Sequence, residues 1–135
     1  MEKISTLVLN LDRRIRFAGV VILKGEVIEG GFQEEAKPLP DQDKEQQLYL
    51  ESLLAIGSLK EYSDSLGDLI YNITEYRKVI LMTFPLKDSK ILCISLIPGT
   101  DIMNIKNQVQ GCRWIRYIME ETFLPHLGVN YPATG

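Results

Sequence analysis

The stretch from Lys78 to Pro98 constrains the fold more than any other part of this 135-residue sequence. It reads KVILMTFPLKDSKILCISLIP, two nearly continuous apolar runs separated by the polar residues Lys87, Asp88 and Ser89. Runs of this length that are rich in Ile, Leu, Val and Phe are typical of strands covered on both faces. The sequence therefore predicts a hairpin of two buried strands in the middle of a sheet.

A second pair of strands is predicted closer to the N-terminus. Residues 15–23 have strand composition, and Lys24 with Gly25 forms a candidate two-residue turn before residues 26–31. Gly25 can adopt the positive φ that tight hairpin turns require. The small residues at 18–19 predict either a closely packed helix or room for a ligand, and close helix packing is the commoner reason.

Three helices are predicted around these strands. Residues 3–12 carry apolar side chains at i, i+3, i+4 and i+7, and residues 43–65 are rich in leucine and other helix formers. Gly57 within the second helix predicts the close approach of another backbone. Residues 101–124, with Thr100 as N-cap, are predicted to form one helix of about 36 Å. Such a helix would overhang the strands or meet another subunit.

The remaining segments connect these elements. Residues 32–45 contain two prolines among acidic and amide side chains and predict a long loop, which is either functional or merely mobile. Residues 69–74, LIYNIT, predict a further strand, so that three antiparallel strands follow one another. We expect one domain over residues 1–124 and an irregular tail over residues 125–135.

Composition and charge restrict the class of protein. The chain is 45% hydrophobic and 24% charged, as in soluble globular proteins, and no apolar run approaches the length of a membrane span. Residues 25–68 carry eleven acidic and three basic side chains, which argues against general nucleic-acid binding. Cys93 and Cys112 lie within apolar patterns and predict reduced core cysteines. We therefore expect a cytoplasmic protein.

No motif in the sequence names a reaction. The phosphate-binding patterns GxxxxGK[ST] and GxGxxG are missing, as are HExxH, CxxC and GxSxG. The single histidine, His126, follows Pro125 in the predicted tail, where it is poorly placed to act as a general base. We therefore expect no enzymatic activity, no cofactor and no metal site.

One cluster near the C-terminal end of the predicted last helix is a candidate recognition surface. It consists of Arg113, Trp114, Arg116 and Tyr117. Aromatic and arginine side chains dominate the binding energy of many protein interfaces. The alternative, which ordinary burial habits favour, places Trp114 in the core and the arginines outside.

A second cluster consists of Arg13, Arg14 and Arg16, where the first helix is predicted to give way to a strand. Three arginines so close together can bind an anion. The alternative is that they are solvent-exposed charges at the junction, which is the commoner arrangement.

The predicted order is helix, two-strand hairpin, helix, three-strand meander and helix. Through the segments IRFAGVVILKGEVIEGG, YLESLLAIGSL and KVILMTFPLKDSKILCISLIP, this order resembles the roadblock light-chain fold, a relative of the longin and profilin-like domains. The chain is also similar to small archaeal proteins with an RFAG strand and an FPL hairpin. The resemblance implies an α/β (α+β) fold with a single five-stranded antiparallel sheet, order 2-1-5-4-3, flanked by helices in the order α-β-β-α-β-β-β-α.

The resemblance also implies a function in protein binding. Family members typically form homodimers and act as platforms or regulators for small GTPases. We therefore expect a non-enzymatic, dimeric interaction module whose partners are a second copy and a small GTPase or another protein, without nucleic acid or membrane. In the implied strand order the third strand is an outer one, and its candidate dimer edge comprises Leu69, Ile70, Asn72 and Ile73. The alternative is a small-ligand sensor of PAS or profilin type, with a pocket between the sheet and residues 32–45.

Overall fold

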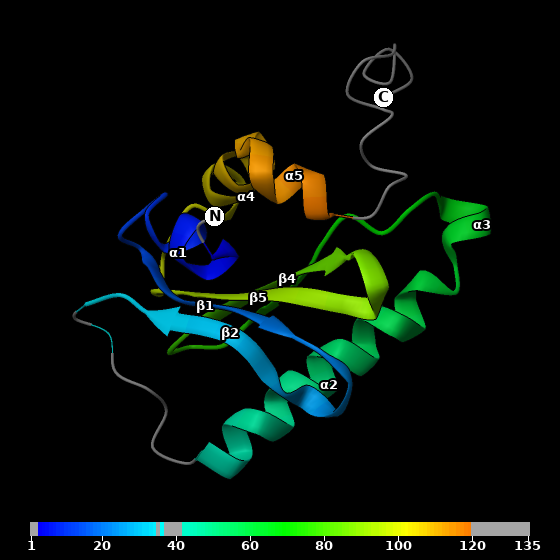
Figure 1. The fold of residues 1–135 in the computed structure, drawn as a ribbon, viewed down its shortest axis with the longest axis horizontal. Coiled ribbons are helices and arrows are strands. Elements are labelled where there is room, and N and C mark those ends of the chain that lie inside the picture. Colours follow the sequence, from blue (N-terminus) through cyan, green and yellow to red (C-terminus); the bar gives the residue numbers. More distant parts are fainter. Residues whose placement is uncertain (1–2, 35, 37–41, 120–135) are drawn as a thin grey trace.

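The chain forms one antiparallel sheet with helices on both faces (Figure 1). The computed structural model describes residues 3–34, 36 and 42–119. The predicted tail, the end of the predicted last helix and part of the predicted 32–45 loop lie outside these residues. In chain order the elements are α1 (Ile4–Leu9), β1 (Ile15–Val21), η1 (Leu23–Gly25), β2 (Val27–Phe32), α2 (Gln42–Lys60), α3 (Ser63–Leu66), β3 (Asn72–Glu75), β4 (Ile80–Leu86), η2 (Lys87–Ser89), β5 (Lys90–Leu96), α4 (Ile102–Gly111) and α5 (Arg113–Ile118).

The strand order is β2-β1-β5-β4-β3, which confirms the expected fold class. The predicted central hairpin is β4 and β5, whose register runs from Ile80 opposite Leu96 to Leu86 opposite Lys90. β5 lies at the centre of the sheet, between β4 and β1. Nearly every side chain of the two strands is buried, as their continuous apolar runs predict.

The β1–β2 hairpin closes through η1, where both Lys24 and Gly25 have a φ of 78°. The positive φ predicted for Gly25 is therefore present. A Cβ atom at Gly25 would lie 2.8 Å from the Cβ of Leu50, because α2 packs directly against this turn. The space at Gly19 is filled by the ring of Phe17, whose Cζ would lie 2.7 Å from an added Cβ atom. The small residue thus accommodates an aromatic ring of the same strand, and neither a helix nor a ligand.

Two apolar clusters pack on the two faces of the sheet. Side chains alternate along each strand, so neighbouring residues belong to different clusters. α1, α4 and α5 cover the larger cluster, and α2 covers the smaller one. Burial of each large apolar side chain stabilises the fold by about 1.5–3 kcal/mol. The smaller cluster consists of Phe17, Val21, Tyr49, Leu53, Ile56, Ile91 and Cys93.

Two predicted helices are divided in the structure. The prediction of one helix over residues 101–124 is wrong, because Cys112 has an extended conformation (φ −79°, ψ 117°) and separates α4 from α5. The break lets α5 turn back over the core, where Ile115 is fully buried and Met119 bridges to Leu86 on β4. The expected overhang is therefore absent from the described part of this helix. The helix predicted over residues 43–65 is likewise split into α2 and α3.

The N-cap of α4 differs from the predicted one. The side chain of Asp101 accepts a hydrogen bond from the backbone N–H of Asn104 at 3.2 Å. The Thr100 hydroxyl instead donates to the carbonyl oxygen of Ile97 at 2.6 Å. Asp101 satisfies one of the free N–H groups at the helix start and places a negative charge where the helix dipole favours it.

Candidate functional site

β3 is an outer strand of the sheet and, among the described residues, pairs with β4 alone. The sequence predicted this strand over residues 69–74, whereas it runs from Asn72 to Glu75. Leu69 and Ile70 precede the strand, and Leu69 packs against the cluster beneath α2. Of the candidate edge residues, Asn72 and Ile73 therefore belong to the strand itself.

The turn after β3 determines which backbone groups face outward. Tyr76 N–H donates to the carbonyl oxygen of Val79 at 2.8 Å, so this pair closes the β3–β4 hairpin with a hydrogen bond. Hydrogen-bonded and non-hydrogen-bonded pairs alternate along an antiparallel ladder. With Glu75 opposite Ile80, the backbone groups of Ile73 and Glu75 point away from β4. Those of Asn72 point toward β4, so Asn72 does not contribute its backbone to the outer edge.

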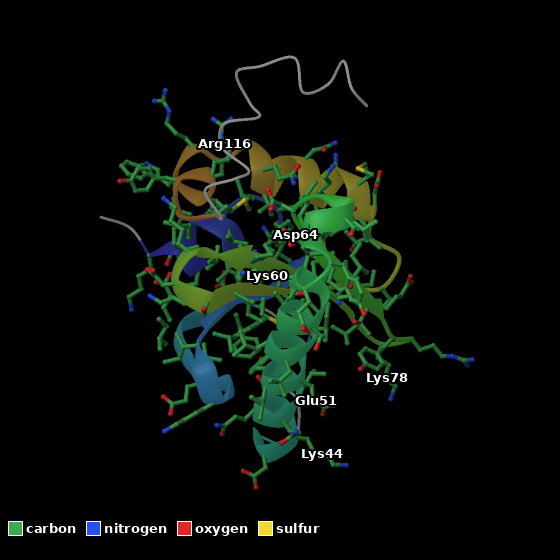
Figure 2. All side chains as sticks on the ribbon, turned by 90° about the vertical axis from the view of Figure 1, so that its right-hand side faces the viewer. Lys44, Glu51, Lys60, Asp64, Lys78 and Arg116 are labelled. Atoms are coloured by element: carbon green, nitrogen blue, oxygen red, sulfur yellow. The ribbon has the colours of Figure 1, made fainter. Side chains whose placement is uncertain are left out.

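Exposed apolar side chains also occur around the C-terminal end of α2, in the following turn and in α3. Leu59, Tyr62 and Leu66 are all exposed, and Leu66 is 82% accessible. Figure 2 shows α2 between the β1–β2 hairpin on one side and the β3–β4 turn with Lys78 on the other. Exposed apolar groups that gather on one surface can mark an interface between proteins.

The predicted recognition residues lie together on α5. Trp114 is 52% accessible, Arg113 and Tyr117 are exposed, and Arg116 is half-buried. The alternative that placed Trp114 in the core is therefore wrong. On α5 the adjacent Ile115 faces the core instead, and it is fully buried. The exposure is compatible with the predicted recognition surface, which stays a prediction.

Arg14 is held in place by its neighbours. Its Nε and Nη2 atoms donate to the Asp12 carboxylate at 2.9 and 2.7 Å, and Nη2 also donates to Asn104 Oδ1 at 2.7 Å. Gln108 Nε2 donates to the same Asp12 carboxylate at 2.8 Å. The hydrogen bonds from Arg14 above all hold the pKa of Asp12 well below its usual range. Arg14 therefore ties the α1–β1 connection to α4, a structural role.

Arg13 and Arg16 line a hollow of about 400 Å³ together with Gln33 and Glu34. The hollow therefore contains the negative carboxylate of Glu34 as well as the positive charges of the arginines. Anion binding by the Arg13, Arg14 and Arg16 cluster stays a prediction.

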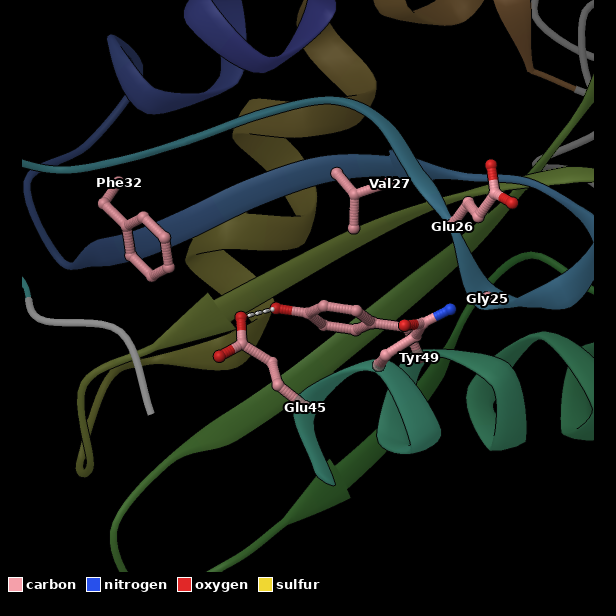
Figure 3. A pocket seen from close by; sticks show the side chains of 7 residues that line it. Gly25, Glu26, Val27, Phe32, Glu45 and Tyr49 are labelled. Carbon is pink, nitrogen blue, oxygen red and sulfur yellow. Dashed lines mark hydrogen bonds between the residues drawn. The ribbon is translucent and has the colours of Figure 1, made fainter. Parts of the chain in front are cut away.

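The pocket expected between the sheet and residues 32–45 corresponds to a hollow of about 430 Å³ beside β2 and the first turns of α2 (Figure 3). Tyr49 donates its hydroxyl to Glu45 Oε1 at 2.6 Å, and its ring stacks on Phe17 with centroids 5.6 Å apart. Burial, and then the hydrogen bond to Glu45, raise the pKa of Tyr49, so the hydroxyl remains a donor. The Tyr49 hydroxyl and the Glu45 carboxylate thus form a hydrogen bond with each other, which does not favour a small-ligand site.

The two cysteines are free thiols in different environments. Cys93 is fully buried in the cluster beneath α2, and burial raises the pKa of its thiol to about 12. Cys112 is half-buried at the break between α4 and α5. A neutral, enclosed thiol such as that of Cys93 is a poor nucleophile.

Residues 3–34, 36 and 42–119 contain no group of three or more His, Cys, Asp or Glu side chains that could hold a metal ion. No helix within the same residues has the length and apolar character needed to cross a membrane.

The fold is similar to that of the roadblock light-chain domains. No protein-family model matches the sequence, and no curated protein matches it at a significant level. Among solved structures, a Roadblock/LC7 domain from Streptomyces avermitilis matches with a TM-score of 0.62 and 12% identity, over 95% of this chain and 100% of that one.

Two structures of the gliding protein MglB give similar matches. MglB from Thermus thermophilus has a TM-score of 0.61 and 14% identity, over 77% of this chain and 76% of that one. MglB with a tetrameric arrangement has a TM-score of 0.65 and 15% identity, over 87% and 86%. At these identities the matches show the fold, and the chain has the roadblock fold.

Proposed function

We propose that this chain is a non-enzymatic protein-interaction module that acts as a homodimer joined through β3. The observation that carries the proposal is the outer edge of β3, where Ile73 and Glu75 direct backbone N–H and carbonyl groups away from the sheet. Unpaired edges invite pairing with another strand, and proteins usually cover them. A second copy is the simplest cover, because one two-fold rotation satisfies both edges.

Exposed apolar side chains at the end of α2 and in α3 are compatible with the same arrangement. Two β3 strands paired antiparallel would bring the two α2 helices to the same face of a joined sheet. Leu59, Tyr62 and Leu66 are exposed in the single chain, and contact with the mate would remove their apolar surface from water. Complete burial of one leucine is worth about 1.5–3 kcal/mol. The tetrameric arrangement of MglB shows that a protein of similar fold self-associates.

The proposed partner class is a small GTPase, which rests on the resemblance to roadblock proteins. The joined sheet would present two α2 helices as a continuous surface. α2 and α3 carry charges of both signs, among them Lys44, Glu51, Lys60 and Asp64 (Figure 2). Mixed charges of this kind can set orientation and specificity toward a charged partner.

The test is binding to purified small GTPases encoded by the same organism, each loaded with GDP or with a non-hydrolysable GTP analogue. We expect calorimetry to show binding that depends on the bound nucleotide, and we expect a monomeric variant to lose it. The proposed partner class is wrong if no GTPase binds at about 100 μM in either nucleotide state, a concentration far above a micromolar Kd. An unbiased pull-down with mass spectrometry would then identify which other protein binds.

A further inference from the structure

A groove beside α2 lies at the end of the sheet where both hairpin turns meet the helix. Its volume is about 440 Å³. One side is the flank of α2 that carries Leu50, Leu54 and Gly57, and the other is formed by η1 and by the start of β5 with Ile91. Leu59 lies half a turn around the helix from Leu50, so the groove and the exposed Leu59 occupy different flanks of α2. None of the residues that line the groove is among those assigned to the homodimer.

The base of the groove is apolar and accessible. Leu54 is 59% accessible although it lies in the middle of a 19-residue helix. Gly57 follows one turn later, and an added Cβ atom there would have no atom within 4 Å. The sequence predicted that another backbone approaches Gly57, and no part of the described chain does so. A glycine is disfavoured inside a helix, and here it leaves the helix backbone open to an external chain.

The rim of the groove is basic. Lys24 on η1, Lys60 on α2 and Lys90 on β5 line it, against a single acidic residue, Glu61. These three lysines come from three different elements, whereas the chain as a whole has a net charge of −3. A basic rim around an apolar base is complementary to an acidic partner with apolar side chains.

The backbone at Lys24 adds an independent observation. Lys24 has a φ of 78° and a ψ of 0°, in the left-handed region that glycine, asparagine and aspartate adopt more readily than lysine. A strained residue at a turn is a reason to look for a function of its side chain. At this turn the lysine contributes a positive charge to the rim of the groove.

We infer that this groove docks an acidic amphipathic helix of a partner protein, with leucine-like side chains against Leu54 and Gly57 and carboxylates against Lys24 and Lys90. The stretch from Leu50 to Glu61 is about 16 Å long, which matches three turns of a docked helix. Recognition of this kind uses apolar anchors one turn apart on one helix face. The inference does not depend on the homodimer, because the two surfaces share no residue.

The probe is a stapled helical peptide of about four turns, with leucines at i, i+4 and i+7 and glutamates at the flanking positions. The control peptide carries lysine in place of each glutamate. Fluorescence anisotropy should show saturable binding of the acidic peptide and binding of the basic peptide that is at least about tenfold weaker. Methyl NMR shifts should map the acidic peptide to Leu50, Leu54 and Ile91.

Variants distinguish this groove from general electrostatic attraction. Gly57→Trp fills the groove, Gly57→Ala is its matched control, and Lys24→Gly removes one charge while relieving the strained backbone. We expect Gly57→Trp and the Lys24→Gly, Lys90→Gln double variant to weaken peptide binding at least about tenfold. Gly57→Ala, which adds a single methyl group, should weaken binding much less than Gly57→Trp. The charge reversal Lys78→Glu, which lies outside the groove, should bind like the wild type. Thermal unfolding of each variant is the control that shows whether it is folded.

Four outcomes would overturn the inference. The first is equal binding of the acidic peptide to the wild type and to folded Gly57→Trp. The second is an equal loss of binding in Lys78→Glu, which would mean attraction without a site. The third is that the wild-type protein sediments as an oligomer and Gly57→Trp sediments as a monomer. The groove would then be a contact between copies of this chain. Absence of any peptide binding at about 500 μM, well above a typical micromolar Kd, also contradicts it.

Discussion

Tyr76 N–H donates to the carbonyl oxygen of Val79 at 2.8 Å, and this bond fixes the direction of the backbone groups along β3. Because the pattern alternates, Ile73 and Glu75 face the open edge and Asn72 faces β4. Pro85 fits the same pattern. It lies on β4 beyond Thr83, which is the last residue that pairs with β3. A backbone N–H at Pro85 would point to the side of the sheet where β3 no longer runs, so its absence removes no hydrogen bond from the sheet.

Glu75→Pro should convert the proposed homodimer to monomer. Proline removes the outward N–H of Glu75 without removing a bond to β4, and the Glu75 side chain is exposed. Sedimentation velocity is the measurement, and circular dichroism should show an unchanged fold. Glu75→Ala keeps the donor and should sediment like the wild type. If both variants sediment alike, the edge is not the contact.

Asp12→Asn should destabilise the fold by about 1–2 kcal/mol at pH 7, because it weakens the charge-assisted bonds from Arg14. The pKa of Asp12 is lowered in the folded state, so its contribution is complete above the unfolded value of about 3.9. It is lost as the pH falls below that value toward the folded pKa. Urea unfolding at pH 7 and near pH 3 should show a smaller difference between variant and wild type at the lower pH. A difference that does not change with pH would contradict this role.

Cys112 should react with a thiol reagent before Cys93 does. Burial and a pKa of about 12 keep the Cys93 thiol neutral and enclosed, whereas Cys112 is half-buried. Mass spectrometry after timed alkylation should locate the first label on Cys112 and a second only after unfolding. Cys93→Ser should cost about 1–3 kcal/mol, because it places a hydroxyl in an apolar cluster. Rapid labelling of Cys93 in the folded protein would refute its structural role.

Trp114→Ala should change the free energy of unfolding by no more than about 0.5 kcal/mol, because more than half of the side chain is in water. Ile115→Ala, the adjacent control, should cost about 2–5 kcal/mol because Ile115 is fully buried. Chemical unfolding of the two variants provides the comparison. Equal losses would mean that Trp114 packs against the folded chain.

The strands were predictable where local chemistry alone determines them. The apolar runs on either side of Lys87, Asp88 and Ser89 require a buried hairpin, and Gly25 marks the turn of the other one. The predicted third strand began too early, because it included the apolar residues Leu69 and Ile70, which precede β3. Leu69 packs beneath α2 before the strand begins.

The break at Cys112 and the exposure of Trp114 could not be predicted from periodicity. The apolar spacing continues from Ile105 and Val109 through Ile115, as it would in one continuous helix. The break depends on tertiary contacts, since Met119 reaches Leu86 across the chain. The groove beside Gly57 was missed for a similar reason, because its basic rim joins residues that are distant in sequence.

Sedimentation velocity of the wild-type protein between about 1 and 100 μM tests the proposed homodimer most directly, because the range spans a typical micromolar Kd. We expect a species of twice the 15.4 kDa chain mass to dominate at the highest concentration. The fraction of monomer should increase on dilution, as the total concentration falls toward the Kd. A protein that sediments as a 15.4 kDa monomer throughout this range would contradict the homodimer and, with it, the role proposed for β3.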